Sequence, residues 1–272
     1  MKTPLVIRLA IMLVMLTGLN SCDLLDFHPY DGRFDGPKDI NARNIARIES
    51  ATLGRDSIVF AVISDTQRWY DETHDAVNSI NARPEIDFVI HCGDLTDFSA
   101  TREFEWMRDE LERLAVPYVC LIGNHDCLAN GPRVFQTMFG TPNFSFNAGD
   151  THFICLDTNA LEHDYSVPIP DFAFINADLQ ALPSTTRRTI AAMHACPYSD
   201  QFNNNIAPQF HEKMLTYPDL QFAVCGHQHA TIELEPYGDG FKYYQCGAAK
   251  GRKYLIFTLK KDGGYHREVI DY

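Results

Sequence analysis

Five short apolar runs of the chain each end in polar side chains of the kinds that bind metal ions, and this pattern limits the folds open to it. Short continuous runs rich in Val, Ile and Phe are typical of strands buried on both faces. The runs are "IVFAVISD" ending at Asp65, "DFVIHCGD" ending at Asp94, "PYVCLIGNHD" ending at Asn124, His125 and Asp126, "RRTIAAMHA" ending around His194, and "LQFAVCGHQH" ending at His227 and His229.

The spacing of the first three runs predicts strand–helix–strand units. Asp65 and Asp94 are 29 residues apart, and Asp94 and Asn124 are 30 residues apart, which is the length of one such unit. Parallel units bring the ends of their strands to one edge of the sheet, where ligands bind. We therefore expect the polar ends of the five runs to converge.

The segments between and after these runs predict helices and hairpins. Apolar side chains at helical spacing are clearest over residues 101–114, with Ser99 or Thr101 as the expected cap. Alternating runs around "YGDG" (230–249) and "KDGG" (253–272) are typical of antiparallel hairpins. The expected architecture is α/β, with a mixed sheet extended by C-terminal hairpins and helices outside it. The other helices are expected over residues 71–82, 171–182 and 207–217.

The first 21 residues are expected to be a signal peptide rather than part of the fold. Lys2 and Arg8 precede an apolar run from Leu9 to Leu19, which is too short to span a membrane. The following "LNSC" resembles a bacterial lipoprotein box, in which Cys22 is lipidated and becomes the N-terminus. The alternative is a secreted protein cut near Ser21. We divide the rest into a tether and lead-in over residues 22–56 and a domain over residues 57–272.

Charge and cysteine content exclude some classes of protein. The formal net charge is −13, and an acidic surface repels nucleic-acid backbones, so we expect no nucleic-acid polymer as partner. A phosphate substrate is not excluded, because bound cations reverse the local field. The eight cysteines show no paired spacing of a disulfide framework or a zinc knuckle, and most of them are expected to be buried thiols.

The convergent residues form a mixed set of oxygen and nitrogen donors suited to divalent transition metals. His227 and His229 alone are as well explained as ordinary loop residues, but their alternation places both on one face of an extended segment. Six donors exceed the four or so that one ion needs. Two ions sharing a carboxylate are the usual apparatus for displacement at phosphorus. The six are Asp65, Asp94, Asn124, His194, His227 and His229, with Gln67 two residues after the first.

The motif series "SDTQ", "GDLTD", "GNHD", "MHACP" and "GHQH" resembles that of the calcineurin-like metallophosphoesterase superfamily, over roughly residues 57–250. This resemblance implies a four-layer α/β/β/α sandwich with mixed sheets. It also implies two divalent metal ions, Mn, Fe or Zn, with Asp94 bridging them. Asp65 and His229 would bind the first metal, and Asn124, His194 and His227 the second.

The same resemblance implies the chemistry, which is attack on a phosphate ester by a hydroxide that two metals activate. His125 would then stabilise or protonate the leaving oxygen, with Asp126 holding His125 in orientation. Gln67 departs from the family pattern, which has histidine at that position. A glutamine oxygen is a weaker donor for a transition metal than imidazole, so Gln67 is expected either to bind the first metal weakly or to contact the substrate only.

Other polar and aromatic residues near the motifs have simpler interpretations. Asp97 is expected to support its loop, and His91 to be a buried histidine rather than a ligand. Trp69 and Tyr70 either flank the substrate or pack their loop, and Tyr198 with "FNNN" at 202–205 is more often explained by packing than as a pocket rim.

The expected function is metal-dependent hydrolysis of phosphate esters by a lipoprotein of a bacterial cell envelope. Two alternatives stay open. One is a phosphodiesterase acting on cyclic nucleotides, nucleotide derivatives or lipid headgroups. The other is a non-catalytic metal-binding lipoprotein with a degenerate site. The sequence gives no indication of the substrate or the oligomeric state.

Overall fold

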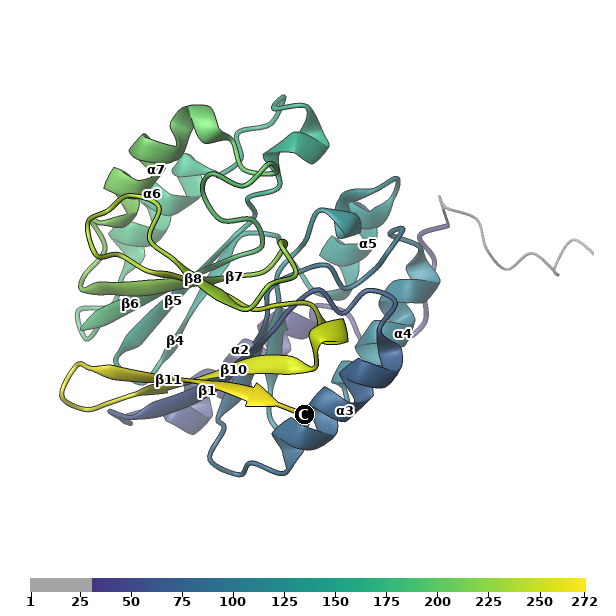
Figure 1. Cartoon of the computed structure of the whole chain (residues 1–272), viewed down its shortest axis with the longest axis horizontal. Helices are drawn as coiled ribbons and strands as arrows, with labels where there is room; N and C mark the ends of the chain where they lie inside the picture. Colours follow the sequence, from purple (N-terminus) through teal and green to yellow (C-terminus); the bar gives the residue numbers. More distant parts are fainter. Residues whose placement is uncertain (1–30) are drawn as a thin grey trace, which may run out of the picture.

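The computed structural model describes residues 31–272, which form two β-sheets packed face to face between two groups of helices (Figure 1). The signal peptide expected over residues 1–21 and the lipidation site expected at Cys22 lie outside the described residues. No helix within residues 31–272 is both long enough and apolar enough to cross a membrane.

The first sheet has five strands in the order β11-β10-β1-β2-β3. Strands β1, β2 and β3 run parallel, as the spacing of the first three runs predicts, and β10 pairs antiparallel with both β1 and β11. The strands are β1 (Ile58–Ile63), β2 (Phe88–His91), β3 (Tyr118–Cys120), β10 (Lys253–Leu259) and β11 (Tyr265–Asp271).

The second sheet has six strands in the order β4-β5-β6-β7-β9-β8, with β5, β6, β7 and β9 parallel. The two C-terminal hairpins are confirmed, but they extend different sheets. The β4–β5 hairpin was missing from the sequence prediction, although it turns tightly at Gly149. The strands are β4 (Phe144–Ala148), β5 (Thr151–Leu156), β6 (Arg188–Met193), β7 (Leu220–Cys225), β8 (Ile232–Leu234) and β9 (Tyr243–Gln245).

Helices cover the outer face of each sheet, so that the molecule has the four α/β/β/α layers that the sequence predicts (Figure 1). A core rich in phenylalanine fills the space between the sheets, where Phe60 stacks on both Phe88 and Phe257. Helices α3 (Tyr70–Asn81), α4 (Thr101–Leu111) and α5 (Gly131–Met138) pack on the first sheet, and α6 (Phe172–Ala181) and α7 (Ala207–Met214) pack on the second.

The expected cap of α4 is wrong. Its N-cap is Ala100, and the Glu103 carboxylate accepts hydrogen bonds from the backbone N–H groups of Ala100 and Phe98 at 3.0 Å. The Ser99 hydroxyl instead donates to the His125 carbonyl oxygen at 2.6 Å. Ser99 therefore ties the start of α4 to the loop after β3.

Part of the segment that we expected to be only a lead-in belongs to the folded domain. Residues 40–52 form helix α2 (Ile40–Thr52), whose Ile48 is buried in the core between the sheets. The Asn41 side chain exchanges two hydrogen bonds with the backbone of Cys120, at 2.8 and 2.9 Å, and Asn44 donates to the Tyr118 carbonyl. These amides satisfy the open edge of β3, so the domain starts well before residue 57.

Candidate metal centre

All the predicted donors lie in loops that directly follow strands, and these loops meet at one edge of the sandwich. Asp65, Asp94 and Asn124 follow β1, β2 and β3 of the first sheet. His194 and the pair His227 and His229 follow β6 and β7 of the second sheet. The centre is therefore built from both sheets, because each contributes the carboxyl ends of parallel strands.

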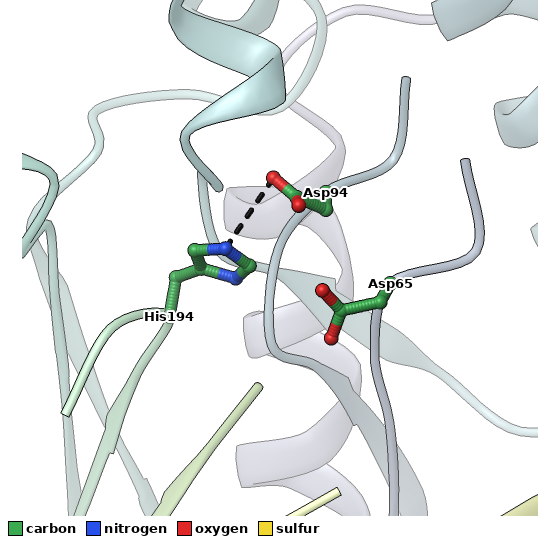
Figure 2. Close-up of side chains that lie close together, drawn as sticks. All are labelled: Asp65, Asp94 and His194. Atoms are coloured by element: carbon green, nitrogen blue, oxygen red, sulfur yellow. Dashed lines mark ion pairs between the residues drawn. The ribbon is translucent and has the colours of Figure 1, made fainter. Parts of the chain in front are cut away.

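Three buried side chains from these loops point toward one another (Figure 2). Asp65, Asp94 and His194 each offer a ligand atom, and these atoms lie within 4.8 Å of one another. Their side chains are almost fully shielded from solvent. Two buried carboxylates beside an imidazole carry a large cost unless a proton or a cation compensates their charge.

Asn124, His194 and His227 form one donor group with Asp94. The Asn124 Oδ1 atom lies 3.0 Å from His194 Nε2 and 3.0 Å from His227 Nδ1. The Asp94 Oδ1 atom lies 3.4 Å from the same His194 Nε2. The sequence prediction assigned these four residues to the second metal, and the structure brings all four together.

The contacts on the far side of each imidazole determine which nitrogen faces this group. His194 Nδ1 lies 2.7 Å from the Cys92 carbonyl oxygen, which only accepts hydrogen bonds, so Nδ1 carries a proton. His227 Nε2 lies 2.6 Å from Asp200 Oδ1 in the same way. When both rings are neutral, the lone pairs of His194 Nε2 and His227 Nδ1 therefore face the Asn124 oxygen. Three acceptors directed at one point fit a metal cation, and second contacts of this kind are typical of metal-binding histidines.

Asp65, Gln67 and His229 form the rest of the site. The Asp65 Oδ1 atom is buried and accepts no hydrogen bond, although His229 Nε2 lies 3.3 Å from it. Gln67 reaches the site, where its Nε2 atom donates to Asp94 Oδ2 at 2.8 Å. An unpaired buried carboxylate oxygen is costly, and it is available to a cation here.

The two carboxylate oxygens of Asp94 have different neighbours. Its Oδ1 atom faces His194 and also accepts the His125 backbone N–H at 2.9 Å, whereas its Oδ2 atom accepts from Gln67. The two oxygens are therefore held in separate directions by separate contacts.

Two glycines allow the loops to approach this closely. A Cβ atom on Gly123 would lie 2.2 Å from Asp94 Oδ1, and one on Gly226 would lie 2.7 Å from Asp65 Oδ2 and 1.9 Å from Ser64 Oγ. Any side chain at either position would displace a predicted ligand. The glycines of "GNHD" and "GHQH" are therefore part of the architecture of the site.

The backbone of the site is strained. Residues other than glycine rarely adopt positive φ angles, and such conformations persist where the surrounding structure holds them, often at functional sites. Five of the seven predicted metal-binding residues do so: Asp65 (51°), Gln67 (27°), Asp94 (59°), His227 (76°) and His229 (57°).

The electrostatics of the centre favour positive charge. Burial alone lowers the pKa of His194, but the charge of Asp94 and then that of Asp65 outweigh burial and raise this pKa to about 10. Burial raises the pKa of Asp94, yet His194 and His125 together bring it well below its usual range. The same negative charge that holds a proton on His194 attracts a metal cation in its place.

His91 supports the centre without entering it. Burial lowers its pKa to about 4, so the ring is neutral near pH 7. Its Nε2 atom is hydrogen-bonded to the Thr66 hydroxyl at 2.8 Å, and its Nδ1 atom accepts the Gly93 N–H at 3.2 Å. His91 thus joins the loop of Asp65 to the loop of Asp94, in agreement with its interpretation as a buried histidine.

The role expected for Asp126 needs correction. Its carboxylate is buried among the backbone N–H groups of Gly123, Leu95 and Thr96 and contacts no atom of the His125 ring. The His125 Nδ1 atom lies 2.9 Å from the Asp97 carbonyl oxygen instead. In the short 3₁₀ helix η2 (His125–Cys127), Asp126 turns inward and fixes two loops, whereas His125 stays partly exposed. Asp97 therefore orients His125.

Sequence reasoning missed one residue of the centre. Asp200 lies six residues after His194, in a loop that carries no motif, and its contact with His227 joins segments 27 residues apart.

The cysteines behave as expected. Within residues 31–272 all seven are free, and six of them are buried.

The four-layer fold and this oxygen and nitrogen donor set are those of a metal-binding α/β protein, and sequence comparison identifies its family. The family model described as calcineurin-like phosphoesterase matches residues 58–231. The chain therefore belongs to the calcineurin-like phosphoesterases, as the motif series predicts.

Curated relatives are similar over parts of their length. A 3′,5′-cyclic-nucleotide phosphodiesterase of Nostoc sp. is 25% identical over 154 residues, which cover 54% of this chain and 57% of that protein. A probable glycerophosphodiester phosphodiesterase of Arcobacter nitrofigilis is 36% identical over 56 residues, which cover 21% of this chain and 20% of that protein. The chain thus spans little more than half of the Nostoc protein and much less of the other.

Solved structures share the fold. A dimetal phosphatase from Danio rerio superposes with a TM-score of 0.60 at 14% identity, covering 79% of this chain and 99% of that one. A purple acid phosphatase from yellow lupin seeds superposes with a TM-score of 0.57 at 14% identity, covering 79% of this chain and 54% of that one. At this identity the likeness concerns the fold alone.

Proposed function

We propose that the protein hydrolyses phosphate esters with two divalent metal ions that share Asp94. The observation that carries this proposal is the convergence of Asp65, Asp94 and His194, whose ligand atoms lie within 4.8 Å of one another. Asn124 and His227 extend this cluster beside His194, and His229 extends it beside Asp65. Asn124, His194 and His227 would hold one ion, and Asp65 and His229 the other. Bound divalent metals supply an activated water and neutralise charge on the phosphoryl oxygens.

The residues of the chain contribute orientation and a proton. The Asp97 carbonyl can only accept, so His125 Nδ1 carries a proton, and Nε2 is left for the substrate. In the doubly protonated ring, Nε2 donates to the leaving oxygen as a general acid. The side chain of His125 is 36% exposed, which gives the substrate access to it. The buried Asp126 carboxylate holds the loop after β2 and the loop after β3 together.

Phosphodiesters are the proposed substrates, because both curated relatives described above carry phosphodiesterase names. The competing function is metal binding without catalysis. Gln67 favours that alternative, since its amide nitrogen contacts Asp94 where the family pattern has a histidine. His125, placed beside the donor groups and not needed for metal binding, favours catalysis.

One assay separates the two functions. The protein is stripped of metal with a chelator, reconstituted separately with Mn²⁺, Fe²⁺ and Zn²⁺, and assayed on 4-nitrophenyl esters of phosphoric acid, both mono- and diesters. The proposal predicts metal-restored hydrolysis that Asp94→Asn abolishes. Protein that binds metal fully and hydrolyses neither kind of ester under any of the three metals would establish the non-catalytic alternative.

We also propose that Cys22 carries lipid and anchors the protein to a bacterial membrane. The support is the sequence alone, with a positively charged start, a short apolar run and "LNSC". Mass spectrometry of protein from the producing cells should find a lipidated Cys22 as the N-terminus. An unmodified N-terminus elsewhere would replace this proposal with a soluble secreted protein.

A further inference from the structure

A cleft of about 290 Å³ opens beside the candidate metal centre. Gln228, which lies between the two histidines of "GHQH", forms one wall, and Tyr198, four residues after His194, forms another. Leu234 and Glu235 close the far end. A substrate whose phosphate reaches the metal centre would therefore have part of its alcohol next to this cleft.

Tyr198 is held in the cleft by a strained turn. Its side chain is 51% exposed, which is unusual for a large aromatic residue in a well-packed region, and its φ angle is 70°. Asn204 stabilises this conformation from both sides, because it accepts the Tyr198 N–H at 2.8 Å and donates to the Ser199 carbonyl at 2.8 Å. These two hydrogen bonds hold the strained turn in place, which keeps the Tyr198 ring at the cleft.

The Tyr198 ring contacts a stacked pair of rings, Tyr237 and His211, at a tilt of 54°. Its ring centroid lies 5.4 Å from that of Tyr237, and Tyr237 stacks on His211 at 3.7 Å with an interplanar angle of 7°. The Tyr237 hydroxyl donates to the Ala207 carbonyl at 2.8 Å, which anchors the stack to the start of α7. Tyr198 is therefore a rigid aromatic surface, and it pays little conformational entropy when a ligand packs on it.

The chemistry of the cleft selects among possible occupants. No Lys or Arg is among the described residues that line it, and Glu235 adds a negative charge, so a second phosphate or another anionic group is disfavoured. The exposed amide of Gln228 offers both a donor and an acceptor. An aromatic wall with a few polar groups suits a neutral planar ring with hydrogen-bonding edges.

We propose that this cleft binds a planar ring carried by the ester, such as a nucleobase or an aryl group, which stacks on Tyr198. The inference rests on the proposed function, because it assigns the substrate's alcohol to a place next to the metal centre. Tyr198 then determines specificity and takes no part in the chemical step. Its removal should change which esters are preferred, with little effect on the smallest ester.

The test uses methyl phosphodiesters that differ in the second alcohol, which is methanol, cyclohexylmethanol, benzyl alcohol or the 5′-hydroxyl of thymidine, so that no other planar ring is present. Hydrolysis is followed by ³¹P NMR. Metal-loaded wild type should give kcat/KM values about 5- to 100-fold higher for the benzyl and thymidine esters than for the methyl and cyclohexylmethyl esters. This is the effect expected for one aromatic stack. Equal kcat/KM values for the benzyl and thymidine esters indicate stacking alone. A higher kcat/KM for the thymidine ester indicates additional hydrogen bonds to the polar edge of the base.

Three variants locate the effect. Tyr198→Ala should lose the preference while keeping activity on the methyl ester, and Tyr198→Phe should keep both. Tyr165→Ala is the matched control, because Tyr165 is 47% exposed with a φ angle of 56° and does not line the cleft. A wild type without preference, or a Tyr198→Ala variant that loses activity equally on all four esters, would overturn the inference.

A binding measurement separates this inference from the proposed function. Calorimetry compares thymidine 5′-monophosphate with methyl phosphate on metal-loaded wild type and Tyr198→Ala. If no ester is hydrolysed but thymidine 5′-monophosphate binds more tightly in a Tyr198-dependent way, the proposed function fails and the ring site stands. If the esters are hydrolysed and both phosphates bind equally, the ring site fails alone.

Discussion

Asp200 Oδ1 lies 2.6 Å from His227 Nε2, and this contact leaves the Nδ1 atom of His227 directed at Asn124. The hydrogen bond from His227 lowers the pKa of Asp200, so the carboxylate is charged at neutral pH. A carboxylate behind a metal-binding histidine fixes the ring and makes the facing nitrogen a better donor. Asp200 is therefore a positioning residue of the centre, although its side chain is 76% exposed.

Asp200→Asn should weaken binding of the second metal by about 10- to 100-fold, because contacts of this kind are worth that much in metal affinity. Calorimetric titration with Mn²⁺ or Zn²⁺ measures it. Asp271→Asn is the matched control, since Asp271 is also 76% exposed and paired with a cation, but lies on β11 away from the centre. Equal metal affinities in both variants and wild type would limit the Asp200 contact to a surface ion pair.

The two metal sites should differ in affinity because of Gln67. Its nitrogen contacts Asp94, so the first group has fewer donors than the second. Gln67→His should lower the metal concentration that gives half-maximal activity, and Gln67→Ala should raise it. Gln209→His, an exposed change on α7, is the control for an added histidine. If all the proteins share one metal dependence and only KM changes, Gln67 contacts substrate and binds no metal.

His125→Ala should separate catalysis from metal binding. The ring offers no atom to either donor group, so metal content should stay at the wild-type level while kcat falls by about 10²- to 10⁴-fold, the usual effect of losing a general acid. The loss should be smaller for 4-nitrophenyl esters than for alkyl esters, because a good leaving group needs less protonation. Equal losses on both kinds of ester would assign His125 to charge stabilisation only.

Asp178 should stabilise the fold, with a defined dependence on pH. From helix α6, its carboxylate accepts hydrogen bonds from His152 at 2.9 Å and Tyr217 at 2.8 Å, and also from Ser145. Burial opposes ionisation of Asp178, but these bonds lower its pKa below the usual value. A lowered folded-state pKa contributes stability above the unfolded-state value of about 4, and this contribution is lost as the pH falls through the folded-state pKa.

Asp178→Asn should therefore reduce the free energy of unfolding by about 1–3 kcal/mol at pH 7. The difference from wild type should shrink below about pH 4, where the wild-type carboxyl also becomes protonated. Urea unfolding followed by circular dichroism at pH 7, 5 and 3.5 measures it. A difference that grows on acidification would contradict the sign of the shift.

The convergence of the donors of the first sheet was predictable from the sequence because it follows from a regular rule. Asp65, Asp94 and Asn124 end parallel strands, and such ends share an edge whatever the loops between them do. The expectation that Asp94 bridges two metals came from the motif series, since spacing alone does not show which carboxylate two metals would share.

The missed features depend on contacts between distant parts of the chain. Asn41 and Asn44 belong to a polar segment whose composition is that of a tether. Only the folded structure shows that their side chains pair with the edge of β3. Asp126 is next to His125 in sequence, yet the 3₁₀ turn directs the two side chains apart. The contact of Asp200 depends on the path of a loop, for which no periodic pattern exists.

Anomalous X-ray diffraction from crystals grown with excess Mn²⁺ tests most directly whether Asp94 joins two metal sites. Data collected above the manganese edge should contain two anomalous peaks about 3.5–4 Å apart, one on each side of the Asp94 carboxylate. One peak should lie among Asn124, His194 and His227, and the other beside Asp65 and His229. A single peak at saturating Mn²⁺, bound through one oxygen of Asp94 with no metal beside Asp65, would contradict the account.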